Sequence, residues 1–375
     1  MGHLHDAKEA VYRALAERLS KNPVGVKVNK TLMEILHRLY TESEALVGGS
    51  FPLAPVTIDK IATGSGIEEN SLKNILEGMA EKGLVIDLPR RDKVLYILAP
   101  MVIGFFEYTF MRVRDDINMK ELAELFERYF QNDEARAELS GGATKMFKAL
   151  VYEKIVPAVV ETEVLSYERA SDIIRSSGGG ALSMCSCRHK ASHLNKACGA
   201  PLDVCTTLGK NGAEWLVRRE LGKPATVDEL LRVLEQTEKA GLVHLGDNVL
   251  NKPTFICHCC GCCCTVLHSI RESGKLMAHP SNFIPRLAKE DCSGCAACSA
   301  ACQIRAITMR GEAGGTELPL IKEDICLGCS VCACACPTGA LTMSRRRDLH
   351  QPPQNSTEKF ARIAMEKGRV IKHDA

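Results

Sequence analysis

The residues best equipped for chemistry in this chain are its cysteines, and they are grouped rather than spread. All nineteen lie between Cys185 and Cys336, and the first 184 residues contain none. Thiolates bind soft metal ions and iron–sulfur clusters, which need several of them within chelating distance. Disulfide frameworks are distributed along secreted chains instead. The grouping therefore predicts a reduced metalloprotein with a metal-free and a metal-rich half, typical of an oxygen-poor cytoplasm.

Two cysteine runs near the end of the chain share the spacing C-x2-C-x2-C-x3-C. They are Cys292, Cys295, Cys298 and Cys302, and then Cys326, Cys329, Cys332 and Cys336, which precedes Pro337. Three cysteines at this spacing wrap a cubane cluster within a short loop, and a fourth reaches across to another cluster. Two complete copies predict two 4Fe–4S clusters.

This stretch resembles the two-cluster module of bacterial ferredoxins. The resemblance implies crossed fourth ligands, so that one cluster takes Cys292, Cys295, Cys298 and Cys336, and the other takes Cys326, Cys329, Cys332 and Cys302. It also implies short strands at 304–309 and 340–343 around an enlarged hairpin loop, and a relay for electrons. Two residues depart from the family pattern: Gln303 replaces a proline, and Cys334 is either a spare thiol or a competing ligand.

A first upstream group has the spacing C-x-C-x10-C-x6-C and consists of Cys185, Cys187, Cys198 and Cys205. In an extended segment Cys185 and Cys187 point to the same side and can grip one metal. A third iron–sulfur cluster, structural zinc and unliganded thiols are the alternatives. His189 and His193 are the imidazole candidates for zinc if the stretch is helical.

A second upstream group packs six cysteines into eight residues: Cys257, Cys259, Cys260, Cys262, Cys263 and Cys264. Neighbouring cysteines in a strand face opposite ways, so one metal cannot easily take all six, and Gly261 permits a bend. The run supplies ligands to one or two centres, completing the site begun at Cys185–Cys205, or holds redox-active thiols. Its Cys-Cys-Gly tripeptide resembles the cysteine-rich domains of heterodisulfide reductase-like proteins, which hold unusual clusters.

The metal-free half begins with apolar periodicity typical of helices at 8–20, 30–46, from Thr57, and 71–82, followed by a hairpin at 84–98. This order resembles a winged helix. The candidate recognition helix, 68–82, carries four glutamates against two lysines, and a helix entering the major groove is expected to be basic. Protein contact is therefore predicted in place of DNA binding. Residues 101–165 are predicted to be wholly helical.

The totals exclude several classes of protein. A net charge of +2 argues against nucleic acid or an anionic membrane as the main partner. The sequence lacks an apolar run of about 20 residues that could span a bilayer, and it opens without a signal peptide pattern. The basic triplet 345–347 is predicted to be solvated, with steering of an acidic partner as the alternative.

These observations predict an α+β protein: a mainly α-helical N-terminal half with a winged-helix-like segment, a cysteine-rich central domain and a C-terminal ferredoxin-like dicluster module. The expected domains are 1–115 (winged-helix-like), 116–180 (helical connector), 181–280 (cysteine-rich), 281–345 (ferredoxin) and 346–375 (tail).

The predicted function is a relay of single electrons through two 4Fe–4S clusters, with either a further cluster or zinc upstream. The expected partner is a redox protein, namely an oxidoreductase, a ferredoxin or a flavoprotein. One alternative is a catalytic iron–sulfur oxidoreductase subunit centred in 185–264, although no catalytic residue is identifiable. The other is a redox-sensing winged-helix regulator.

Overall fold

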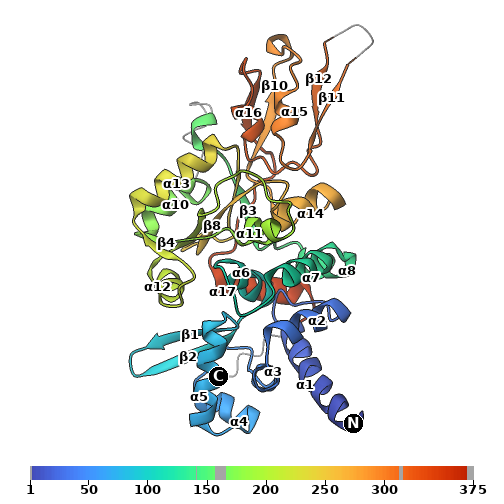
Figure 1. The fold of residues 1–375 in the computed structure, drawn as a ribbon. Coiled ribbons are helices and arrows are strands. Elements are labelled where there is room, and N and C mark those ends of the chain that lie inside the picture. Colours follow the sequence, from blue (N-terminus) through green and yellow to red (C-terminus); the bar gives the residue numbers. More distant parts are fainter. Residues whose placement is uncertain (1, 141, 157–165, 312–315, 370–375) are drawn as a thin grey trace.

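The chain is arranged in three tiers in the computed structural model (Figure 1). The N-terminal helices and a hairpin form one tier, a seven-stranded sheet with its helices forms the next, and a ferredoxin-like module forms the last. The structure describes residues 2–140, 142–156, 166–311 and 316–369. Within these residues, none of the helices combines the length and apolar character that crossing a bilayer requires.

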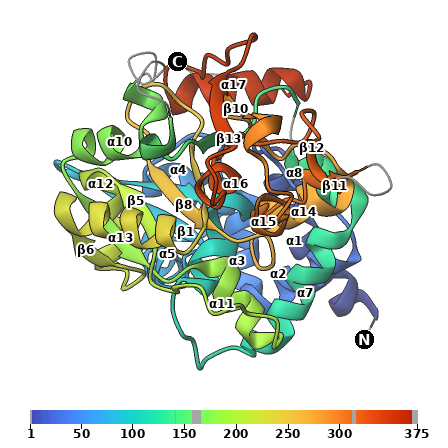
Figure 2. The same cartoon turned by 90° about the horizontal axis from the view of Figure 1, so that it is seen from above.

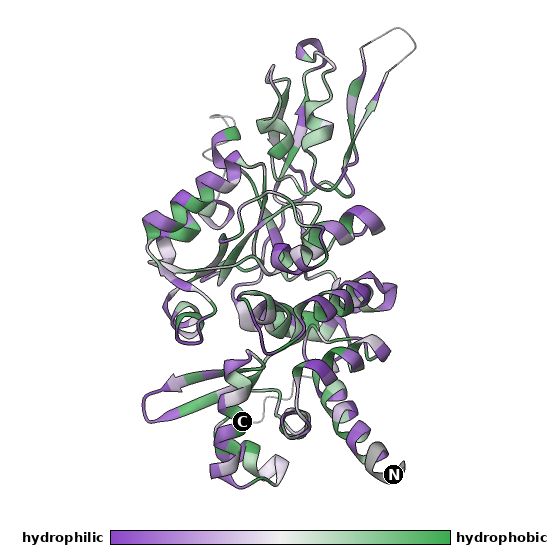
Figure 3. Cartoon of the chain, viewed as in Figure 1, coloured by the Kyte–Doolittle hydropathy of each residue, from purple (hydrophilic) through white to green (hydrophobic). Residues whose placement is uncertain are grey.

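The N-terminal tier is built from amphipathic helices around one apolar core. Its elements are α1 (Gly2–Ser20), α2 (Lys30–Leu39), α3 (Glu42–Gly49), α4 (Ile58–Ser65), α5 (Glu69–Glu81), β1 (Val85–Arg90) and β2 (Lys93–Leu98). Hydrophobic and hydrophilic residues alternate along α1, as expected for a helix with one buried face (Figure 3). The predicted hairpin is confirmed, because β1 pairs antiparallel with β2. A winged helix stays a prediction for this region.

The single helix predicted at 30–46 is wrong, because the chain breaks at Tyr40. Thr41 begins α3 instead, and its side chain and that of Glu44 form a reciprocal capping box. Such a box satisfies the backbone donors of a new helix start, so a second helix begins where apolar periodicity suggests continuity.

The prediction of helix throughout 101–165 is also wrong. The helical part consists of the kinked segment Met101–Phe105, α6 (Phe106–Phe110), α7 (Met119–Gln131) and α8 (Asp133–Ser140). Then β3 (Phe147–Leu150) joins the central sheet, with all four residues buried. A short apolar run of this kind fits a buried strand as well as a helix. The part of this prediction at 157–165 lies outside the described residues.

The central sheet has the order β6-β4-β5-β8-β7-β3-β9. Its strands are β4 (Gly180–Ser183), β5 (Cys205–Leu208), β6 (Lys223–Ala225), β7 (Val243–Asp247), β8 (Phe255–Cys259) and β9 (Ala278–His279), in addition to β3. Every pairing is antiparallel except that between β3 and β9. The middle strand, β8, carries two of the cysteines.

Helices cover both faces of this sheet. They are α10 (Ala170–Ser177), α11 (Ser186–His193), α12 (Lys210–Arg218), α13 (Val227–Lys239) and α14 (Thr265–Ser273). Seen from above, α10 and α13 lie on one side of β8 and α14 lies on the other (Figure 2). Thr226 and Glu229 form a reciprocal capping box at the start of α13.

The ferredoxin-like module comprises β10 (Phe283–Leu287), α15 (Ala297–Ala301), β11 (Ile307–Arg310), β12 (Leu318–Ile321), α16 (Val331–Cys334) and β13 (Leu341–Arg345). The predicted short strands are present, and each has its own antiparallel partner: β11 pairs with β12, and β13 pairs with β10. The enlarged hairpin loop that the ferredoxin resemblance implies therefore contains one arm of a hairpin, β12, and the part of it at 312–315 lies outside the described residues.

The C-terminal segment returns to the N-terminal tier. Its helix is α17 (Ser356–Glu366), and Lys367 at the C-cap of this helix pairs with Glu138 of α8. Lys359 forms an ion pair with Asp247 of β7, and both side chains are almost fully buried. Beyond α17, Arg369 pairs with Glu138 of α8.

The basic triplet is not simply solvated, contrary to the prediction. Arg346 donates to the carbonyl oxygens of Ser281, Phe283 and Cys326, and Arg345 pairs with Glu168. These bonds tie the end of β13 to Cys326 of the second cysteine run, to the start of β10 and to Glu168 before α10.

Candidate metal centres

The first ferredoxin run forms a small cavity with one distant cysteine. Its lining includes Cys292, Cys295, Cys298 and Cys336, so the chain brings together the set implied by the crossed arrangement. The thiol of Cys336 also lies near enough to Cys298 for its charge to affect the pKa of Cys298. The assignment of these four residues as ligands stays a proposal.

The second run gathers around Cys302 in the same crossed way. Burial raises the pKa of Cys329 to about 12, and the neighbouring Cys302 and Cys326 add to this effect. Burial likewise raises the pKa of Cys332. A buried thiol gives up its proton readily only when a cation replaces it, so metal binding here releases protons.

The two cysteine loops repeat one backbone conformation. Gly294 and Gly328 occupy equivalent positions and have φ values of 69° and 65°, which glycine tolerates without strain. A side chain at Gly328 would also meet the carbonyl oxygen of Phe283 at 2.0 Å. Cys334 is exposed on α16 and does not line the first cavity.

The ten upstream cysteines do not divide as their spacing suggests. Cys198 joins three cysteines of the later run, Cys260, Cys262 and Cys263, and we call these four residues the four-cysteine cage. In the part of the chain that the structure describes, it is the one group of three or more His, Cys, Asp or Glu side chains whose ligand atoms all lie within 4.8 Å of one another. The set Cys185, Cys187, Cys198 and Cys205 is therefore not brought together.

The dimensions of the cage fit one metal ion. Its Sγ–Sγ distances are 3.6 Å for Cys198–Cys260, 3.6 Å for Cys262–Cys263 and 3.8 Å for Cys198–Cys263. A Zn–S bond of about 2.3 Å gives tetrahedral thiolates a mutual separation of about 3.8 Å. A cubane cluster places iron and sulfide between its ligands and holds them further apart. The two ferredoxin sets do not meet the 4.8 Å criterion that the cage meets.

The remaining upstream cysteines form a second assembly, the six-thiol set: Cys185, Cys187, Cys205, Cys257, Cys259 and Cys264. Strand geometry positions three of them. Cys257 and Cys259 alternate with His258 along β8 and so share a face. Because Thr206 of β5 pairs with Ile256 of β8, Cys205 falls opposite Cys257.

Helix starts position the other three. Cys185 is the N-cap of α11, Cys187 lies in the first turn of that helix, and Cys264 is the N-cap of α14. The extended conformation that would let Cys185 and Cys187 point to the same side therefore ends at Cys185. Hydrogen bonds from Cys187 and Cys259 lower the pKa of Cys264, and the backbone N–H groups of the first turn of α14 add to this effect.

A buried arginine joins the two assemblies. Arg188 of α11 is 2% exposed, and its guanidinium donates to the carbonyl oxygens of Pro201 and His258. Its pKa is raised by Cys185 and Cys260, one thiol from each assembly, against the opposing effect of burial. A buried guanidinium stays charged and needs anions nearby, so it offsets the negative charge of metal-bound thiolates. Neither periodicity nor a motif in the sequence indicates this role.

The two candidate histidines do not join either assembly. The stretch is helical, and Nε2 of His189 lies 3.1 Å from Nε2 of His193. However, His189 also contacts the carbonyl oxygen of Phe110 at 2.8 Å, and neither ring belongs to the cage. Both rings pack against Phe110 in the aromatic core.

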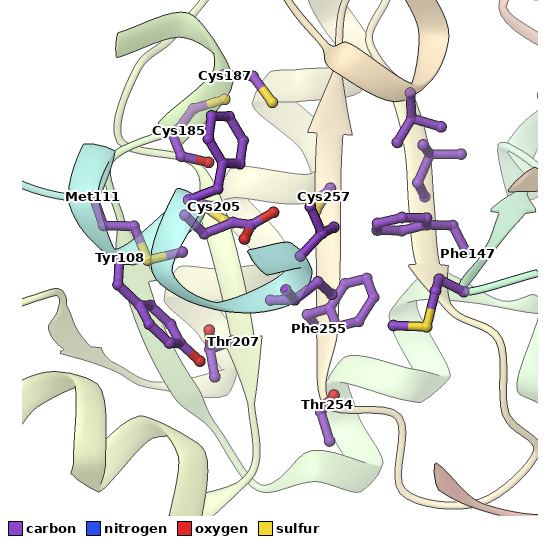
Figure 4. A pocket seen from close by; sticks show the side chains of 18 of the residues that line it. Tyr108, Met111, Phe147, Cys185, Cys187, Cys205, Thr207, Thr254, Phe255 and Cys257 are labelled. Carbon is purple, nitrogen blue, oxygen red and sulfur yellow. The ribbon is translucent and has the colours of Figure 1, made fainter. Parts of the chain in front are cut away.

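A cavity of about 360 Å³ opens beside the six-thiol set. Figure 4 shows Cys205 and Cys257 across it, with Tyr108 and Met111 on one side and Phe147 on the other. Its lining is mostly apolar and includes the half-buried side chain of Glu107. Burial raises the pKa of Glu107 to about 8, so this group is largely protonated at neutral pH.

The cage also touches the ferredoxin-like module directly. The N–H of Gly261 donates to Oε1 of Gln303 at 2.8 Å, and Nε2 of Gln303 donates to the carbonyl oxygen of Gly241 at 3.0 Å. Gln303 follows Cys302, where the ferredoxin pattern has proline. The apparent departure from the pattern thus connects two metal-rich segments, because proline could make neither bond.

Comparison with protein families supports a ferredoxin-like C-terminal module. Residues 291–340 match the family model described as a 4Fe-4S dicluster domain. No match was found to the chain among curated proteins or solved structures. The match and the cysteine geometry together support iron–sulfur clusters and an electron-transfer role for this part of the chain.

Proposed function

We propose that this protein relays single electrons through two 4Fe–4S clusters between a redox partner and a cysteine-rich centre. The observation that carries the proposal is the direct bond between Gly261 and Gln303, which places the upstream cysteines next to the second ferredoxin set. One apolar cluster also runs from Cys259 and Cys264 to Cys326 without interruption. Short, dry contacts of this kind suit electron transfer inside a protein.

In this proposal the four-cysteine cage holds zinc rather than a third cluster. The thiol separations of 3.6 to 3.8 Å support a single tetrahedral ion. The ion fixes the bend at Gly261 and thereby the surface that contacts Gln303. The cage is then a structural element of the relay and takes no electrons itself, because Zn²⁺ has no redox chemistry.

The winged-helix-like tier acts as a protein-packing element in this proposal. Asp87 of β1 accepts from Nε1 of Trp215 at 2.9 Å and pairs with Arg219, the C-cap of α12. The same Arg219 pairs with Glu77 of α5, so part of the candidate recognition helix is already occupied by this chain. These contacts support packing over DNA binding.

The first test is anaerobic metal analysis of the purified chain together with electron paramagnetic resonance. The ferredoxin pair alone accounts for about 8 irons per chain, and the cage for one zinc. Cys262→Ser should remove the zinc, whereas Cys334→Ser, at another exposed cysteine, should change neither metal. Zinc that survives Cys262→Ser, or a total well below about 8 irons, would contradict the proposal.

The second candidate function is that of a catalytic iron–sulfur oxidoreductase subunit. The observation that favours it is the apolar cavity beside the six-thiol set, since an electron relay alone needs no such space. Turnover of a small molecule by the full chain with a chemical reductant would distinguish the two functions.

A further inference from the structure

The six-thiol set differs from the cage in its dimensions. No three of its sulfur atoms lie within 4.8 Å of one another, as judged from the described residues, and the two ferredoxin sets share this property. Its members nevertheless lie close together, because strand register sets Cys205 opposite Cys257. Cys264 is also near enough for its charge to affect the pKa of Cys187, Cys257 and Cys259. The thiols thus surround a space too wide for one ion and suited to a polynuclear centre.

The surroundings of the set favour a charged cluster over free thiols. The cysteines are buried or half-buried, and the Nε atom of Arg188 is buried without a hydrogen-bond partner in the described structure. A permanent cation held among thiols is stabilised only if several of them are anionic. Metal-bound thiolates meet this condition, whereas six neutral thiols do not.

The cavity gives one side of this centre access to a ligand. Cys257 and Cys205 line it from the sheet, Leu88 lines it from β1, and Val102 and Phe106 line it from the kinked segment and α6. Its volume of about 360 Å³ is in the range of sites for small organic molecules. An apolar lining makes a charged ligand expensive to bury.

We propose that the six-thiol set binds a polynuclear iron–sulfur cluster, and that the face of this cluster toward the cavity binds a small, uncharged, largely apolar molecule. The carboxyl of Glu107, which accepts from the N–H of Gly104 at 2.8 Å, lies in the same cavity and offers the ligand one polar contact. The inference rests on the proposed relay only for the supply of electrons, since binding requires none.

The test uses the full chain, purified without oxygen, and n-butyl isocyanide as the probe, because it is apolar and binds iron that has an open position. The expected result is about 4 or more irons beyond the ferredoxin pair and a spectral change on adding the isocyanide. The signals of the two ferredoxin clusters should not change, because all their irons carry cysteine.

Two variants make the test specific. Cys257→Ala should remove both the extra iron and the response to isocyanide. Thr207→Phe fills the cavity from β5 and should keep the iron but weaken isocyanide binding at least tenfold, whereas the isosteric Thr207→Val should bind as the parent does. Iron content equal in the parent and Cys257→Ala, or equal isocyanide binding by Thr207→Phe and the parent, would overturn the inference. If the parent chain lacks the ferredoxin signals but has the extra iron and responds to isocyanide, the proposed relay is refuted and the proposed cluster site is still supported.

Discussion

Replacing Gly261 with alanine tests the contact on which the relay depends. A Cβ atom at this position would lie 1.9 Å from the carbonyl oxygen of Gln303 and 2.8 Å from its carbon, so backbone must move. Overpacking of this kind costs about 1–3 kcal/mol. Loss of the bond from the N–H of Gly261 to Gln303 adds about 0.5–1.5 kcal/mol. The contact should therefore weaken by roughly 1.5–4.5 kcal/mol.

Hydrogen exchange measured without oxygen reports this loss locally. Because about 1.36 kcal/mol corresponds to a factor of ten, amides at 257–264 and 302–306 should exchange about 13- to 2,000-fold faster in Gly261→Ala. Reduction of the upstream centre through the ferredoxin clusters should slow in the same variant.

The matched control is Gly199→Ala, beside Cys198 of the same cage. An added Cβ there meets nothing within 4 Å, and the substitution reduces the entropy of the unfolded chain. Exchange should stay as in the parent. If the amides at 257–264 and 302–306 exchange equally fast in Gly261→Ala and in Gly199→Ala, the stability of these segments does not depend on the contact between Gly261 and Gln303, and the prediction is refuted.

Three further predictions concern the scaffold. Asp87→Asn should destabilise the chain by about 1–3 kcal/mol by removing the charge that Arg219 faces, and an unchanged urea midpoint at pH 7 would count against this prediction. Burial raises the pKa of Asp87, but its arginine and Trp215 partners outweigh burial and lower the pKa. The stabilisation is therefore present above about pH 4 and is lost as pH falls through the lowered pKa. Burial lowers the pKa of His244 to about 3, so the unfolded chain binds a proton at this histidine before the folded chain does. Stability is therefore lost as pH falls from about 6.5 toward 3, and the loss at pH 5 is about 2 kcal/mol. His244→Gln should reduce the slope of the urea midpoint against pH in this range, and an identical slope in the parent would refute the assignment. Lys359→Met leaves the buried carboxylate of Asp247 unpaired and should cost about 3–5 kcal/mol, with part recovered by adding Asp247→Asn, whereas a cost below about 0.5 kcal/mol would show that the pair contributes little.

Local interactions made much of the fold predictable from sequence. Helix starts such as Thr226 depend on residues within one turn, and the hairpin at 85–98 depends on two adjacent runs. The predictions of secondary structure were wrong where apolar periodicity was outweighed by capping residues or by strand partners elsewhere in the chain. The capping box at Thr41 divides an apparently continuous helix, and Phe147–Leu150 became a strand because the sheet offered partners on both sides.

The cysteine runs at 292–302 and 326–336 were also predictable from local sequence, since three thiols at that spacing already surround one cluster. The grouping of the upstream cysteines was not predictable in this way, because contacts between segments about sixty residues apart decide which cysteines belong to the cage and which to the six-thiol set. Strand register sets Cys205 opposite Cys257, and loop docking carries Cys198 to Cys260. Spacing along a chain fixes which thiols can chelate together, but only packing fixes which ones meet.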